Sequence, residues 1–158
     1  MKRICVFSDS HGYGEHMARV IRAERPDLVI HLGDGESDLW RLEREFPDLP
    51  VENVRGNCDV HSDALPVLRT TVGGKRIFAT HGHKYNVKLD PQYQRLLYAA
   101  LEDEADIVLF GHTHVPYRDR VLSMDILNPG AVGDVACPTY GLVTIDGDRV
   151  TTEIRRAL

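Results

Sequence analysis

Short runs of apolar residues recur along the chain, and each is followed by a turn rich in Gly, Ser, Thr or polar residues. Runs of about four to eight residues rich in Val and Ile are typical of strands buried on both faces. We expect strands at 4–7, 28–32, 51–54, 77–80 and 107–110. In open α/β sheets, ligands bind beyond the carboxyl ends of the strands. The turns after these five runs are therefore the first place to look for chemistry.

Other segments carry helical spacing or hairpin signals. Two helices are expected between the first three strands and a third helix precedes the strand at 107–110, since Pro residues stop the first two and an apolar stripe marks the third. Gly-rich turns predict two hairpins. The expected helices are 16–25, 37–46 with Ser37 as N-cap, and 91–103; the hairpins are 66–72 with 75–80 and 140–145 with 149–154.

Helix–strand alternation near the N-terminus and a strand-rich remainder predict an α/β fold of two sheets packed face to face, with helices outside. The chain has 158 residues, 42% of them hydrophobic and 27% charged, which suits a globular domain. It contains no internal repeat, low-complexity tract or linker. Residues 1–158 are therefore expected to form a single domain.

Charge and cysteine usage narrow the function classes. A net charge of −5 argues against binding to long nucleic acid, and no apolar stretch approaches the roughly 20 residues that span a membrane. A small phosphorylated substrate fits better, because bound cations would dominate the local field. Three cysteines without Cys-x-x-Cys spacing, and no secretory signal, suggest free thiols and a cytoplasmic location. A homo-oligomer is a further possible assembly of this chain.

Seven polar residues of metal-binding type follow the apolar runs. In extended backbone, residues i and i+2 point the same way, so each Asp-x-His or His-x-His pair is expected to present two donors to one place. A mixed set of imidazole, carboxylate and amide donors suits Mn, Fe, Zn, Ni or Co better than Ca or Mg. The candidate ligands are Asp9, His11, Asp34, Asn57, His81, His112 and His114.

The same positions form five ordered motifs that resemble those of the calcineurin-like metallophosphoesterases. The resemblance spans most of the chain and is closest to the small prokaryotic phosphodiesterase branch of the YfcE type, which is related to the retromer subunit Vps29. The motifs are Asp9-x-His11, Gly33-Asp34, Gly56-Asn57-x-Asp59, His81-Gly82-His83 and Gly111-His112-x-His114.

The resemblance implies a four-layer α/β/β/α sandwich and two divalent transition-metal ions, with Mn²⁺ favoured over Fe, Zn, Ni or Co. Asp34 is expected to bridge the two ions and to be catalytic together with Asn57. Two such ions about 3.5–4 Å apart would ionise a shared water for in-line attack on a phosphoester. The implied ligands are Asp9, His11 and His114 for one ion, and Asn57, His81 and His112 for the other.

The chain departs from the wider family at the position after Asn57. Many members have a His there as leaving-group acid with an acidic partner, whereas this chain has Cys58 beside Asp59. A thiol with a pKa of about 8.5 is a poor acid, so substrates with good leaving groups are expected to react fastest. Cys58 and Asp59 are nevertheless the expected catalytic residues at this position. His83 is an alternative acid, and Asn57, His83 and Arg55 are expected to contact substrate.

Two further expectations concern support and rival function. His31, inside an apolar strand, is expected to be a hydrogen-bonded core residue and not a ligand, and Asn128 is expected to support the site from beneath. The alternative to an enzyme is a Vps29-like interaction module that keeps the fold without catalysis. A scaffold would have no need of four correctly spaced histidines.

Overall fold

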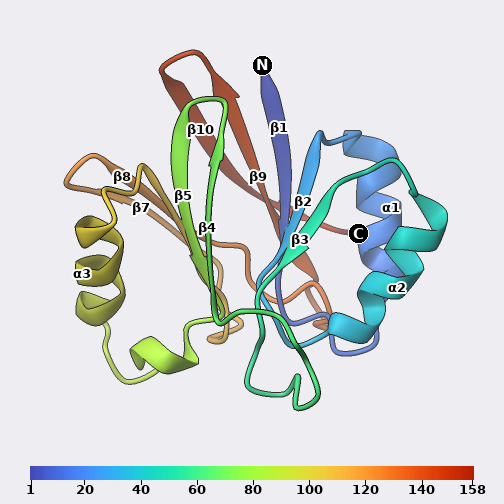
Figure 1. Cartoon of the computed structure of the whole chain (residues 1–158). Coiled ribbons are helices and arrows are strands. Elements are labelled where there is room, and N and C mark those ends of the chain that lie inside the picture. Colours follow the sequence, from blue (N-terminus) through green and yellow to red (C-terminus); the bar gives the residue numbers. More distant parts are fainter.

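The computed structural model describes residues 1–158 and contains two five-stranded mixed sheets with helices on their outer faces (Figure 1). The first sheet has the strand order β10-β9-β1-β2-β3. Its strands are β1 (Lys2–Phe7), β2 (Leu28–His31), β3 (Val51–Asn53), β9 (Thr139–Asp146) and β10 (Arg149–Arg156).

The second sheet has the order β4-β5-β6-β8-β7. In the first sheet β1, β2 and β3 are parallel, and in the second β5, β6 and β8 are parallel. Parallel neighbours end at the same edge of a sheet, so the loops after them meet at one end of the molecule. The strands are β4 (Val67–Val72), β5 (Lys75–Thr80), β6 (Ile107–Leu109), β7 (Tyr117–Val121) and β8 (Met124–Asn128).

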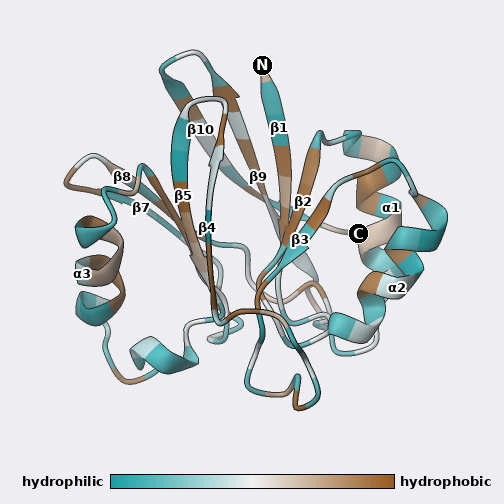
Figure 2. Cartoon of the chain, viewed as in Figure 1, coloured by the Kyte–Doolittle hydropathy of each residue, from teal (hydrophilic) through white to brown (hydrophobic).

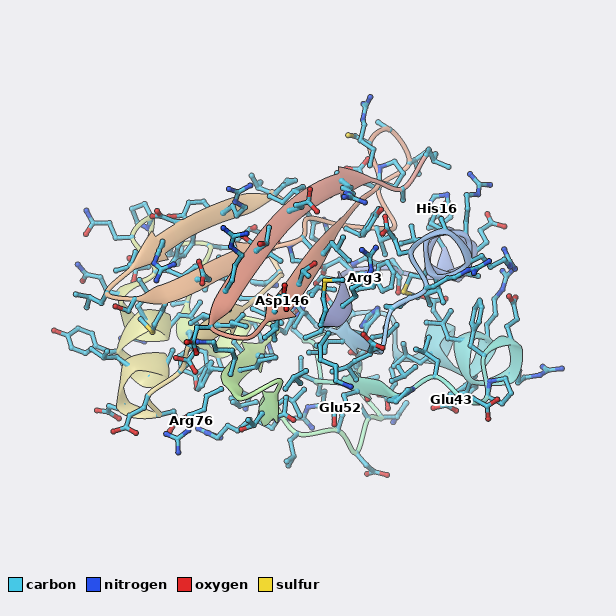
Figure 3. The ribbon with its side chains drawn as sticks, turned by 90° about the horizontal axis from the view of Figure 1, so that it is seen from above. Arg3, His16, Glu43, Glu52, Arg76 and Asp146 are labelled. Carbon is cyan, nitrogen blue, oxygen red and sulfur yellow. The ribbon has the colours of Figure 1, made fainter.

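Helices cover both outer faces. α1 (Gly14–Glu24) and α2 (Glu36–Glu45) lie on the first sheet and α3 (Gln94–Glu102) on the second, with a short 3₁₀ helix, η1 (His83–Tyr85), before α3 (Figure 1). Seen from above, His16 marks α1 on the outer side of the first sheet (Figure 3). None of these helices is long and apolar enough to cross a membrane.

All three helix starts differ from the expectation. α1 begins at Gly14 and not at 16, and the starts of α2 and α3 depend on side chains outside each helix. Ser37 is not an N-cap: α2 begins at Glu36 after Gly35, whose N–H is bound by the distant Asp59 carboxylate. α3 begins at Gln94 because the side chain of Asp90 accepts the Gln94 N–H. Both starts are fixed by carboxylates that lie outside the first helical turn, which local spacing does not reveal.

Apolar side chains fill three layers, as the brown strands in Figure 2 indicate. β1 shows how: Ile4 and Val6 face the space between the sheets, whereas Cys5 and Phe7 face α1 and α2. Burial on both faces explains why the strands read as continuous apolar runs. The third apolar cluster packs α3 on the second sheet. Three apolar clusters thus separate four layers of secondary structure, and the expected four-layer α/β/β/α fold is confirmed.

Both predicted hairpins are confirmed, and a third was missed. β7 and β8 are joined by Leu122 and Ser123, with φ of 49° and 70°. A two-residue turn of this hand favours Asn-Gly or Asp-Gly, and Leu-Ser carries no such signal. The tips of the other two hairpins lie at the upper end of Figure 1; Asp146, next to the β9–β10 turn, is labelled in Figure 3. Polar loops occupy the opposite end of the molecule.

Candidate metal centre

Candidate ligands from four loops converge at the lower end of the molecule in Figure 1, beyond the carboxyl ends of β1, β2, β5 and β6. One group is Asp9, His11 and His114. Asp9 Oδ1 lies 3.1 Å from His114 Nε2 and 3.5 Å from His11 Nε2. The donor atoms of the three residues lie within 4.8 Å of one another, close enough to share one cation.

The second group is Asp34, His81 and His112. His81 Nε2 lies 3.2 Å from Asp34 Oδ2 and 3.1 Å from His112 Nδ1, and the three donor atoms again lie within 4.8 Å of one another. Burial and the neighbouring His81 lower the pKa of His112 to about 4. Its ring is therefore neutral near pH 7 and keeps a lone pair for a cation.

Asp34 joins the two groups. Its Oδ2 atom, which contacts His81 of the second group, lies 4.0 Å from His11 Nε2 of the first. His81 Nε2 in turn lies 3.9 Å from Asp9 Oδ1. A single carboxylate oxygen thus faces imidazoles of both groups, which is the placement that a bridging ligand needs.

Each carboxylate is oriented through its other oxygen. Asp9 Oδ2 accepts the Ser8 hydroxyl at 2.5 Å and the His112 N–H at 3.2 Å, and Asp34 Oδ1 accepts the Cys58 N–H at 2.8 Å. Burial opposes ionisation of Asp34, but hydrogen bonds from His81 and from the Cys58 N–H outweigh it and hold its pKa well below the usual range. The second oxygen of each carboxylate faces imidazole nitrogens, at His114 for Asp9 and at His81 for Asp34, so the donor set fits divalent metals.

The backbone fixes the orientation of the His81 ring. Its Nδ1 lies 2.7 Å from the Leu32 carbonyl, to which it donates, so Nε2 faces Asp34. Burial lowers the pKa of His81, but the hydrogen bond to Asp34 and the charge of Asp9 outweigh it and raise the pKa overall. A cation entering here would displace a proton from Nε2.

Gly56 is required by the approach of two loops. A Cβ at this position would lie 2.1 Å from Asp34 Oδ1 and 2.4 Å from the Asp34 backbone nitrogen. No flexible neighbour could relieve the backbone contact. The Gly-Asn motif therefore starts with the only residue that lets Asp34 and the next loop approach.

The backbone of the site differs from the extended geometry expected for i and i+2 donors. Eleven non-glycine residues have positive φ, and five of them are candidate ligands. This conformation costs about 1–2 kcal/mol per residue, although Asp and His tolerate it better than most. Consecutive tight turns, not an extended strand, bring the pairs together. The five are Asp9 (56°), His11 (44°), Asp34 (59°), His112 (70°) and His114 (62°).

His31 is a buried supporting residue, as expected. Its Nδ1 accepts the Gly33 N–H at 3.1 Å, so Nε2 carries the proton and donates to Ser10 Oγ at 2.9 Å. Ser10 then donates to Asp38 Oδ2 at 2.6 Å. Burial lowers the pKa of His31 to about 4, so its imidazole is neutral near pH 7. This series of hydrogen bonds connects the loop of His11 with the loop of Asp34.

Ser8, Ser10 and Asp38 were not singled out in the sequence, although all three hold ligand loops in place. The polar run 8–11 directly after a buried strand was the available signal for the two serines. Asn128, by contrast, was expected to lie beneath the site: its side-chain amide, fully buried, donates to Gly111 O and to Thr113 Oγ1 on either side of His112.

Asp59 lies in a different role from the catalytic one expected. Its Oδ2 accepts the N–H groups of Asp34 and Gly56, both at 2.8 Å. Its Oδ1 accepts those of Gly35 and Glu36 at 3.1 and 3.2 Å. With both oxygens occupied by four backbone donors, Asp59 positions the Asp34 loop and is not free to assist a proton transfer.

Asn57, Arg55 and His83 border a hollow of about 430 Å³ that also includes Lys84. Asn57 is exposed, and its amide nitrogen contacts Cys58 Sγ at 3.6 Å. This contact is with a neighbour in the same loop and does not group Asn57 with the other six candidate ligands. The rings of His83 and His81 lie 5.5 Å apart. The hollow therefore adjoins the second group of donors.

Two comparisons of sequence identify similar proteins. A family model described as the calcineurin-like phosphoesterase superfamily domain matches residues 1–148. The probable metallophosphoesterase YsnB of Bacillus subtilis is 33% identical, over 94% of this chain and 87% of its own length. The phosphodiesterase YfcE of Escherichia coli is 29% identical over 50% of this chain and 42% of its own length.

Solved structures share the fold. A predicted phosphoesterase from Streptococcus pneumoniae has a TM-score of 0.81 and 31% identity, covering 99% of this chain and 90% of its own. Vps29 of Chaetomium thermophilum also has a TM-score of 0.81, with 16% identity, 99% of this chain and 89% of its own. At that identity the second likeness concerns the fold alone.

Proposed function

Because the chain belongs to the calcineurin-like phosphoesterase superfamily, we propose that it is a divalent-metal-dependent phosphodiesterase of small substrates. The reaction adds water across one P–O ester bond and releases an alcohol or phenol together with a phosphomonoester. The observation that carries this proposal is the pair of adjoining donor groups, with Asp34 Oδ2 facing both.

The donors divide between two ions. Asp9, His11 and His114 would hold one, and His81 and His112 the other, with Asp34 shared. Asn57 would join the second set, as the family resemblance implies. The mixed nitrogen and oxygen set favours Mn²⁺, with Fe, Zn, Ni or Co as alternatives. When bound, such a pair acidifies a water and neutralises charge on the phosphoryl group.

The side chains beside these donors bind and orient the substrate. Arg55 and Lys84 give the neighbouring hollow a positive charge suited to phosphate oxygens, which Arg can bind through its planar fork. His83 also lines this hollow and is half-buried, so its imidazole would lie beside a phosphate oxygen bound there. Asn57, exposed between the ligands and this hollow, would contact the phosphoryl group and its metal together.

The leaving group receives little help from Cys58. Burial and the nearby Asp34 raise the pKa of this thiol, so it keeps its proton near pH 7 and is a weak acid. We expect an aryl phosphodiester to be hydrolysed at least about 10²-fold faster than an alkyl phosphodiester, the low end of what a general acid contributes. Measuring kcat/KM for a series of esters of graded leaving-group pKa checks this, and a flat series would instead make His83 the acid.

Metal dependence tests the function itself. Protein freed of metal with a chelator should hydrolyse a chromogenic aryl phosphodiester only after Mn²⁺ or another transition ion is restored. His112→Ala, which removes a donor, should respond weakly to added metal. Activity that survives chelation in full would contradict the proposal.

The alternative is an interaction module of the Vps29 kind, which the shared fold favours. A module needs no complete donor set, whereas this chain has one. Metal binding without hydrolysis of any phosphomonoester or phosphodiester would select the alternative.

A further inference from the structure

Trp40 is the chain's single tryptophan, and its side chain is 68% exposed on α2. Tryptophan side chains are highly buried on average, so an exposed one is unusual and suggests a functional role. The inner face of α2 buries Leu39 and Leu42, which turns Trp40 to the outside of the helix. Trp40 therefore contributes little to the core.

The position of Trp40 connects it with the metal centre. α2 begins directly after Asp34 and Gly35, and Trp40 lies one helical turn beyond Glu36. A hollow of about 310 Å³ lies between this part of α2 and the loop after β3, and both Trp40 and Cys58 line it. Figure 1 shows that loop below the sheets, on the side of α2.

This hollow differs in charge from the one beside Arg55. It is lined by Trp40, Val60 and His61 among others and by no Lys or Arg. Its acidic residues are Glu36 and Asp59, and both oxygens of Asp59 are occupied by backbone N–H groups. A second phosphate would be repelled here by Glu36. An uncharged planar ring would instead meet the indole face and the exposed Val60.

The two hollows lie on either side of Asn57 and Cys58, with Asp59 and Val60 lining both. A phosphodiester centred on the metal ligands has two ester groups, which diverge from a tetrahedral phosphorus. The basic hollow suits the anionic side of such a molecule. The other ester group, directed past Cys58, would enter the hollow that Trp40 lines.

We infer that Trp40 is a specificity-determining residue that stacks on a planar aromatic ring in the leaving group of the substrate. The inference rests on the proposed phosphodiesterase function and narrows its substrate class to aryl or nucleobase-bearing esters. An exposed aromatic side chain can stack on many kinds of planar ring, and this interaction is strong enough to change the affinity measurably.

The fluorescence of the metal-loaded protein reports on Trp40 alone, because no other tryptophan is present. Phenylphosphonate, which has no ester bond to hydrolyse, should shift the emission to the blue by shielding the indole from water. Methylphosphonate should shift it little. Equal shifts with the two probes, or no shift with either, would overturn the inference.

Kinetics provide the second readout. Trp40→Ala should raise KM for an aryl phosphodiester at least about fivefold, and Trp40→Phe should restore most of the loss because it keeps a ring. The matched control is Tyr98→Ala, since Tyr98 is an aromatic residue on α3 with a similar exposure of 69%. An unchanged KM in Trp40→Ala would refute the role of Trp40.

Adenosine, with ribose as the control that lacks the base, distinguishes a nucleobase from a simple aryl group. A blue shift with adenosine at lower concentration than with phenylphosphonate indicates a nucleobase, and the reverse order indicates a simple aryl group; both support stacking. The two proposals also fail separately. A protein that hydrolyses nothing refutes the proposed function, whereas one that hydrolyses aryl diesters with no contribution from Trp40 refutes only this inference.

Discussion

Asp34→Asn is expected to lower kcat/KM for an aryl phosphodiester by at least about 10³-fold, more than the roughly 10–100-fold typical of residues that only orient a metal ligand. Asparagine keeps an oxygen for the Cys58 N–H, so the loop should retain its shape. Its amide nitrogen would replace the oxygen that faces His81 at 3.2 Å and would donate to His81 Nε2. The shared negative ligand and a histidine donor are lost together.

Two measurements check this expectation. Activity should be assayed at saturating metal, and metal content by elemental analysis should fall from two ions per chain to one or fewer. Asp146→Asn is the matched control, because Asp146 is an exposed carboxylate next to the β9–β10 turn, which lies at the upper end of Figure 1, opposite the loops of the candidate ligands. A variant with both ions bound and activity within a fewfold of the parent protein would remove Asp34 from its bridging position.

The layers of the fold could be predicted because the strand pattern depends on burial alone. β1 is apolar at four successive positions since one face meets the other sheet and one meets the helices. The β7–β8 hairpin could not, because its Leu-Ser turn takes a conformation that its residue types disfavour. The pairing of β7 with β8 closes that turn, and the two turn residues carry no local signal for it.

The candidate ligands could be found for a related reason: all except Asn57, which follows the half-buried β3, come after a buried strand. What the sequence did not reveal is how they are held. The left-handed backbone at Asp9 and His11 replaces the extended geometry expected there. Hydrogen bonds between side chains and distant backbone groups, such as those of Asp59, depend on which loops become neighbours. That information is present only after folding.

The role of Asp59 leads to the second large effect. Asp59→Asn should lower the free energy of unfolding by about 2–5 kcal/mol near pH 7, because about 1–3 kcal/mol is lost for each buried donor left unpaired. Either orientation of the amide directs its NH₂ group at two backbone N–H donors. These are the pair from Asp34 and Gly56, or the pair from Gly35 and Glu36. Urea unfolding in the presence of a chelator measures this without a contribution from bound metal.

The matched control is Asp134→Asn. Asp134 also accepts two backbone N–H groups, but a single oxygen, Oδ1, accepts both, so an asparagine oxygen can replace it. We expect little change in stability there. A loss as large as that of Asp59→Asn would mean that removal of negative charge, and not unpaired donors, causes the effect.

The stability difference between the parent protein and Asp59→Asn should also depend on pH. Burial opposes ionisation of Asp59, but the hydrogen bonds from Gly56 and the Asp34 loop outweigh it and lower its pKa. A carboxylate whose pKa is lower in the folded state contributes stability above its unfolded value of about 3.9 and loses it as the pH falls through the folded value. The difference should therefore be constant from about pH 5 to 7 and shrink below about pH 4. Unfolding curves at a series of pH values check this, and a difference that stays constant down to about pH 2 would show that the ionised form of Asp59 is not what holds the Asp34 loop.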